Sequence, residues 1–119
     1  MANDYDLTAR NVMLDALGLV AVRVALHTGD PGGVNGASNE VTGGGYARQA
    51  ISWFPAAAGA MDNNANPVFS IPASTTVAWV SYWNAAGSIR YLKKDVSDDV
   101  FSSAGTYTIT DADLDLNDA

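Results

Sequence analysis

The stretch "TTVAWVSYWNA" at residues 75–85 combines β-branched and aromatic residues in an alternating pattern that is typical of a strand. Successive side chains of a strand point to opposite faces, so one face carries Val77, Trp79, Ser81 and Trp83. Val80 and Tyr82 lie on the other face. Because two tryptophans and a valine share a face, we expect that face to be hydrophobic core and Tyr82 to be the more exposed ring.

Short strand-like segments surround this stretch on both sides. They cover residues 19–27, 46–54, 67–73, 88–94, 99–103, 106–110 and 113–116, with Gly, Asn, Pro or Asp between them. A spacing of about ten residues, without alternation of strands and helices, is typical of a sandwich or barrel. We therefore expect an all-β fold, a single β-sandwich of jelly-roll or immunoglobulin-like type over residues 19–116, within one domain of residues 1–119.

Residues 6–17, "DLTARNVMLDAL", are the one segment with convincing helical periodicity, and they predict an N-terminal α-helix. One side carries Ala9, Val12, Met13, Ala16 and Leu17, and the other carries Arg10, Asn11 and Asp15. Gly18 stands where a helix commonly ends. The apolar stripe suits packing on the sandwich or binding of a partner, and both interpretations stay open.

Composition narrows the class of protein. The 119 residues are 48% apolar, enough for one packed core, and no apolar run reaches the roughly 18 residues of a membrane span. The net charge of −7 repels the phosphates of nucleic acid. We therefore expect neither a membrane nor a nucleic-acid partner. Without cysteine there are no disulfides and no cysteine-bound metal.

Residues 28–45 are rich in glycine, as phosphate-binding loops are. None of these glycines precedes a lysine, and "GGGYAR" at 43–48 leads into a strand-like segment, so both common phosphate-binding patterns fail. His27 is the only histidine, and no serine lies in a Gly-x-Ser-x-Gly elbow. A lone histidine at a strand end is typical of a structural hydrogen-bonding residue. We expect a protein that is not an enzyme and has no cofactor.

The weak metal candidate is the segment "TDADLDLNDA" at residues 110–119. On a strand, Asp111, Asp113 and Asp115 would aim their carboxylates at one face. An EF-hand calcium loop also needs a glycine and a glutamate that this segment lacks. We therefore expect no metal site here, with the aspartates solvated and Leu114 and Leu116 pointing inward.

Three longer segments of the sequence resemble a known family. They are "LHTGDPG" (26–32), "NEVTGGGYARQAISW" (39–53) and "FSIPASTTVAWVSYWNAAG" (69–87), which are similar to segments of small bacteriophage virion proteins, particularly of actinobacterial phages. Members are described as minor tail, tail-fibre-like or head-decoration proteins. The resemblance spans roughly residues 7–110, and "SIRYLKKDVSDD" (88–99) replaces the glycine-rich hairpin usual in the family.

The resemblance implies a non-enzymatic structural component of the virion, an accessory capsid-decoration or minor tail protein assembled in the bacterial host cytoplasm. Its implied partners are capsid or tail proteins of the same virion, and many copies would form a symmetric homo-oligomer on the particle. The alternative is a carbohydrate-binding module for host-surface adsorption, with stacking rings supplied by Trp53, Tyr82 and Tyr91.

Residues 28–45 are then expected to form an exposed surface loop. Asp-Pro-Gly at 30–32 favours a turn, and Arg48 is expected to clamp the loop base by pairing with Glu40 or Asp30. Glycines make a loop costly to order, so we expect contacts from a neighbouring protein to compensate. The expected assembly contacts lie on this loop, its base and the helix: Val12, Met13, Asp30, Pro31, Gly32, Glu40, Tyr46 and Arg48.

Overall fold

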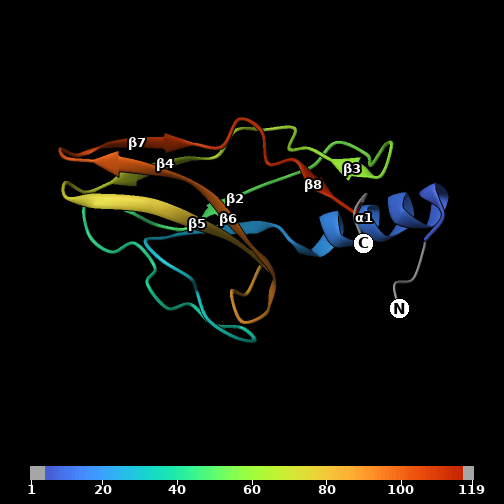
Figure 1. Cartoon of the computed structure of the whole chain (residues 1–119), viewed down its shortest axis with the longest axis horizontal. Coiled ribbons are helices and arrows are strands. Elements are labelled where there is room, and N and C mark those ends of the chain that lie inside the picture. Colours follow the sequence, from blue (N-terminus) through green and yellow to red (C-terminus); the bar gives the residue numbers. More distant parts are fainter. Residues whose placement is uncertain (1–4, 117–119) are drawn as a thin grey trace.

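The computed structural model describes residues 5–116, which form a mostly β-structure with a single helix near the N-terminal end (Figure 1). The elements are α1 (Leu7–Val20), β1 (Arg23–His27), β2 (Gln49–Ala50), β3 (Ala60–Met61), β4 (Val68–Ile71), β5 (Thr75–Trp83), β6 (Arg90–Phe101), β7 (Gly105–Thr108) and β8 (Leu114–Asp115). Each strand pairing among them is antiparallel.

Four strands make the main sheet, in the order β2-β1-β5-β6, and β4 with β7 and β3 with β8 form two smaller ribbons. In the main sheet Leu26 lies opposite Val80, and His27 lies opposite Trp79. Figure 1 shows the β4–β7 ribbon on one side of this sheet and residues 28–45 on the other. The antiparallel layers with one N-terminal helix are consistent with the predicted β-sandwich.

The hydrophobic core lies on the ribbon side of the main sheet. Every element except β2, β6 and β7 supplies buried residues to it, including Leu14, Val24, Leu26, Met61, Phe69, Ile71, Val80, Tyr82 and Leu114. Burying an aliphatic or aromatic side chain of this size stabilises a fold by roughly 1.5–3 kcal/mol. The ribbons are therefore held to the sheet mainly by this shared core.

The prediction of which β5 face forms the core was wrong except at Val77, which is fully buried in the core cluster. Tyr82, expected to be exposed, is 1% exposed and belongs to the core cluster, where Trp53 packs on it with ring centroids 5.7 Å apart. Trp83 is buried but lies outside that cluster, under the guanidinium of Arg48. Trp79 is only half-buried. The tryptophan face is covered by residues 28–45 and their neighbours, and the sandwich core forms on the opposite face.

The helix also differs from its prediction. It continues past Gly18 to Val20, and Gly18 packs closely on β3, because a Cβ there would lie 3.2 Å from the sulfur of Met61. The packed stripe is centred on Leu14, whereas Val12 is 62% exposed. Asn11, expected on the polar side, accepts a hydrogen bond from the Gly59 N–H over 2.9 Å.

Four predicted strand ranges were also wrong. Leu19 and Val20 belong to α1, so the first strand starts only at Arg23. In the 46–54 segment only β2 pairs with β1, and Trp53 instead forms a bridge with Asn63. The predicted strands 88–94 and 99–103 are one strand, β6, because β5 pairs along its whole length and an irregularity absorbs the residues between.

Candidate functional site

The base of the 28–45 loop is held by a clamp around Glu40. Arg48 donates from Nε to one carboxylate oxygen and from Nη2 to the other, each over 3.0 Å. The Tyr46 hydroxyl donates to Glu40 over 2.8 Å and accepts from the Leu26 N–H over 2.9 Å. The Arg48 guanidinium also lies 4.1 Å from the centroid of the Trp83 ring. The expected clamp is therefore present, with Glu40 as its carboxylate.

The clamp sets the charge state of its members. Burial raises the pKa of the Glu40 carboxyl, but hydrogen bonds from Arg48 and Tyr46 outweigh it, so this pKa lies below its ordinary value of 4.5. The hydrogen bonds to Glu40 raise the pKa of Arg48. Burial raises the pKa of the Tyr46 hydroxyl. The clamp is thus an ion pair with a neutral phenol donating to it.

The first turn of the loop follows Asp-Pro-Gly as predicted. The Gly32 N–H donates to the Asp30 carboxylate over 2.9 Å, and Gly32 has a φ of 97°, which glycine adopts without strain. Pro31 is fully buried. Lys93 of β6 donates to Asp30 over 2.6 Å and to the Gly32 carbonyl over 3.0 Å. Asp30, the alternative partner considered for Arg48, is therefore paired with Lys93.

The rest of the loop is pinned by Arg90 of β6. Its guanidinium donates to three loop carbonyls, those of Gly36 over 2.6 Å, Gly33 over 2.7 Å and Gly32 over 3.0 Å. Its backbone N–H donates to the Asn35 side chain over 2.8 Å. The compensating contacts expected from another protein thus come from within the chain. The sequence did contain a signal, because the basic residues Arg90, Lys93 and Lys94 lie close together on a predicted strand.

His27 connects the loop to the sheet from beneath. Its ring is buried, with Nδ1 2.9 Å from the Ser38 carbonyl oxygen and Nε2 2.7 Å from the Ser81 hydroxyl. That hydroxyl accepts the indole N–H of Trp83 over 2.7 Å. Burial lowers the pKa of the His27 ring. The geometry is that of a structural hydrogen-bonding residue, as expected from the sequence.

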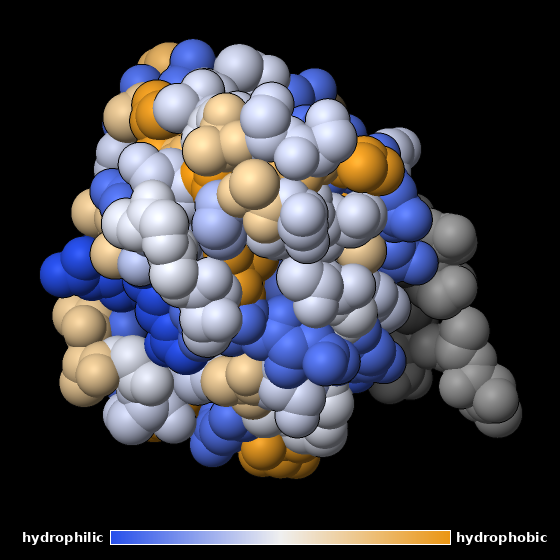
Figure 2. Space-filling model, turned by 90° about the vertical axis from the view of Figure 1, so that its left-hand side faces the viewer, coloured by the Kyte–Doolittle hydropathy of each residue, from blue (hydrophilic) through white to orange (hydrophobic). Residues whose placement is uncertain are grey.

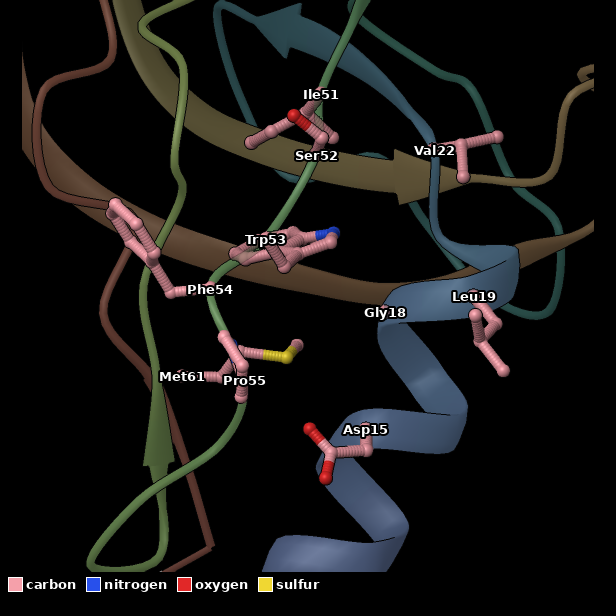
Figure 3. A pocket seen from close by; sticks show the side chains of 10 residues that line it. All are labelled: Asp15, Gly18, Leu19, Val22, Ile51, Ser52, Trp53, Phe54, Pro55 and Met61. Atoms are coloured by element: carbon pink, nitrogen blue, oxygen red, sulfur yellow. The ribbon is translucent and has the colours of Figure 1, made fainter.

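A second feature is an apolar surface at α1. The outer side of the helix exposes Val12 and Leu19, the latter to 81%. Beside Leu19 lies a cleft of about 530 Å³, lined mostly by apolar side chains. Leu19 borders one side and Phe54 the other, with Trp53 between them (Figure 3). Sequence reasoning missed Leu19 and Phe54, because both were assigned to strands.

Of the predicted assembly residues, those of the loop base and first turn lie together on the loop side of the sheet, and the two of α1 lie elsewhere. Of these two helix residues, Val12 is exposed to solvent and Met13 is half-buried. At the loop tip, Val34 is 94% exposed. The loop therefore offers a small apolar tip above a rigid polar base.

The three rings considered for glycan stacking do not form a platform. Tyr82 is buried in the core, and Trp53 is half-buried with its indole N–H donating to the Ala21 carbonyl over 3.0 Å. Tyr91 is exposed on β6. Within residues 5–116, Trp53 packs on the buried Tyr82, and the three rings therefore do not share one exposed surface.

The three aspartates do not alternate along a strand. β8 holds only Leu114–Asp115, and Asp113 has a φ of 46°, which interrupts the extended backbone. Asp62 raises the pKa of the nearby Asp111 carboxyl through charge repulsion. Leu114 is buried as expected, but Leu116 is exposed. Within residues 5–116, no three metal-ligating side chains are grouped closely enough to hold an ion.

In the described part of the chain, α1 is too short and too polar to cross a membrane. The model of the family described as Gp80, Podophage GP4 fiber I protein gp80, matches residues 5–110 of the chain. No curated protein and no solved structure matches the chain.

Proposed function

Because this chain belongs to the Podophage GP4 fiber I protein gp80 family, and is thus a structural protein of a bacteriophage virion, we propose that it is a minor tail component of fibre type. It acts through protein–protein contacts with other tail proteins of the same virion. The family description names a fibre protein, which favours the tail over decoration of the capsid. The proposal includes no catalytic step and no cofactor.

The observation that carries this proposal is the apolar surface of α1 and its cleft. Val12 and Leu19 are exposed on the helix, and Phe54 is 57% exposed across the cleft. Exposed apolar side chains beside an apolar cleft commonly mark a protein–protein contact site. We assign its coverage to a neighbouring tail protein.

The other end of the molecule supports this choice. Figure 2 views the end away from α1, where hydrophilic side chains cross the lower half and apolar ones are scattered. The loop tip at Val34 is a second, smaller contact in this proposal. Its rigid base, formed by Glu40, Tyr46 and Arg48, holds that tip in place.

We also propose that residues 1–119 act as one domain and that several copies form a symmetric homo-oligomer. In it the protein is made and assembled in the host cytoplasm. The acidic charge of −7 supports contact with protein partners and not with nucleic acid.

The test is incorporation of variants into phage particles. Leu19→Asp places a charge on the proposed contact surface, and Val100→Asp is the matched control, since Val100 is 70% exposed on β6. We expect both variants to melt like the wild type. Leu19→Asp should be depleted from purified tails, and Val100→Asp should be present at wild-type amounts.

Quantitative mass spectrometry of separated heads and tails gives the readout. Normal occupancy of Leu19→Asp would show that the helix surface makes no required contact. Recovery of the wild-type protein on heads alone would contradict the tail assignment and favour capsid decoration.

A further inference from the structure

The outer edge of the main sheet is β6, which is the longest strand of the fold. β6 ends the order β2-β1-β5-β6, so it pairs with β5 on one side only. Its twelve residues are all exposed or half-buried. Within residues 5–116, its backbone makes one hydrogen bond outside the sheet, from the Arg90 N–H to the Asn35 side chain. Beyond Arg90, this edge therefore presents N–H and C=O groups with which another strand can pair.

The charges of β6 are divided between its two halves. The first half carries the basic residues and the second half the acidic ones: Arg90, Lys93 and Lys94, then Asp95, Asp98 and Asp99. Like charges directly opposite each other on two strands are destabilising, and opposite charges are stabilising. Two parallel β6 strands would align like charges, whereas two antiparallel ones bring each basic half to an acidic half. The strand is therefore complementary in charge to an antiparallel copy of itself.

The faces of β6 indicate the register of such a pair. Lys94 lies opposite Val80 of β5. Asp99 lies opposite Val77, and both valines belong to the core. Lys94 and Asp99 are therefore on the same face of the sheet, as two residues opposite each other in an antiparallel pair must be. The register that fits places Lys94 of one copy opposite Asp99 of the other.

The same register also matches the neighbouring residues. Leu92 of one copy then lies opposite Phe101 of the other, and both are half-buried apolar side chains packed against the core. The two-fold axis passes between residues 96 and 97, within the stretch where β6 departs from regular pairing with β5. The regular segments on either side of this irregularity are thus the ones that pair.

Both members of the charged pair can take this contact. The Lys94 ammonium donates to the carbonyl oxygens of Ala112 over 2.8 Å and Asp113 over 3.3 Å, which leaves the third of its donors. The Asp99 side chain belongs to an exposed residue, and the ion pairs described within residues 5–116 join other residues. A carboxylate from a second copy is therefore a suitable acceptor for the remaining Lys94 donor.

We propose that β6 pairs with β6 of a second copy of this chain in an antiparallel, two-fold arrangement that joins two main sheets edge to edge. The Lys94–Asp99 pair then occurs twice, because a two-fold interface uses the same surface of both copies. Charges on an edge strand commonly block pairing with other chains, and here their separation into halves blocks all but the antiparallel copy. The inference deepens the homo-oligomer of the proposed function by naming its surface, which is distinct from α1.

The first experiment locates the interface by cysteine cross-linking of the purified full chain. The chain has no cysteine, so Ser97→Cys introduces a single thiol beside the two-fold axis. Ser103→Cys is the matched control, because Ser103 is also exposed but lies beyond the end of β6, where an antiparallel pair keeps the two copies far apart. Mild oxidation should convert the Ser97→Cys protein into a disulfide-linked dimer and leave the Ser103→Cys protein as single chains on a non-reducing gel.

The second experiment exchanges the charges and measures the dimer Kd by sedimentation equilibrium. Asp99→Lys and Lys94→Asp each place like charges opposite each other at both ends of the pair, and each should raise the Kd by about tenfold or more. A mixture of the two variants restores opposite charges at both positions, so it should form a mixed dimer more tightly than either variant associates with itself. Asp6→Lys makes the same change of charge on an exposed residue before α1, and it should leave the Kd unchanged.

A wild-type protein that stays monomeric at every concentration overturns the proposal, as does equal cross-linking at both cysteines or a mixture that associates no better than its components. If Lys94→Asp does not fold, the comparison of Asp99→Lys with Asp6→Lys decides. These measurements use purified protein, so their failure is separate from that of the tail contact, which incorporation of Leu19→Asp tests. Val100→Asp, the control in that test, adds a carboxylate to the acidic half of β6 and should keep the pairing.

Discussion

The 28–45 loop and helix α1 are held to the rest of the chain by different kinds of contact. The loop is fastened by polar groups, with Arg90 and Lys93 on its carbonyls and Arg48 on Glu40. The helix is fastened by one apolar stripe centred on Leu14 and by hydrogen bonds that Asn11 and Asp15 accept from backbone N–H groups. It leaves Val12 and Leu19 in solvent. A glycine-rich loop is therefore not a contact surface by composition alone. The exposed apolar side chains of the helix are the stronger indication of a missing partner.

The loop side of this comparison is tested most strongly at Trp83. Trp83→Ala should reduce the free energy of unfolding by ~3–5 kcal/mol, because the ring is buried under the clamp although it lies outside the main core. Trp79→Ala should cost clearly less, since Trp79 is half-buried. Guanidinium unfolding of both variants checks this. Equal small losses would show that the loop does not seal the tryptophan face.

The helix side is tested by a matched pair of leucines. Leu14→Ala should cost ~2–5 kcal/mol, because Leu14 is buried against the core. Leu19→Ala should change the free energy of unfolding by about 0.5 kcal/mol or less, because Leu19 is mostly exposed. Unfolding curves of the isolated protein give both values. A large cost for Leu19→Ala would mean that its stripe packs within the chain and is not available to a partner.

The clamp is expected to give a smaller effect than Trp83 or Leu14, and one that depends on pH. Glu40→Gln should cost ~1–2 kcal/mol near neutral pH, through weaker hydrogen bonds from Arg48 and Tyr46. The pKa of Glu40 is lowered in the folded state, so its contribution is present above 4.5 and is lost as the pH falls through the folded value. Unfolding at about pH 7 and about pH 4 should therefore show the difference between wild type and variant shrinking in acid. A constant difference would show that the charge of Glu40 does not matter.

Much of the clamp was predictable from the sequence. The pairing of Arg48 with Glu40 and the turn at Asp30 depend on residues close in the chain, where turn chemistry and short separations decide the geometry. The pinning of the loop by Arg90 and Lys93 was not predicted. Those residues lie more than fifty positions from the loop residues that they bind, and they reach them only because β6 pairs with β5.

The sequence by itself determined which side chains of residues 79–83 share a face, because the two-residue period of a strand is a local property of the backbone. It did not place Val77, which lies in the core with Val80 and Tyr82 beyond an irregularity in the β5–β6 pairing. It also determined the presence of the helix, the antiparallel class of the fold and the turn after β1. Only the tertiary structure decided which β5 face became the core. Both faces are apolar enough to be buried, and the choice depended on what covered them: the β4–β7 ribbon over Tyr82, and the 28–45 loop with Arg48 over Trp83.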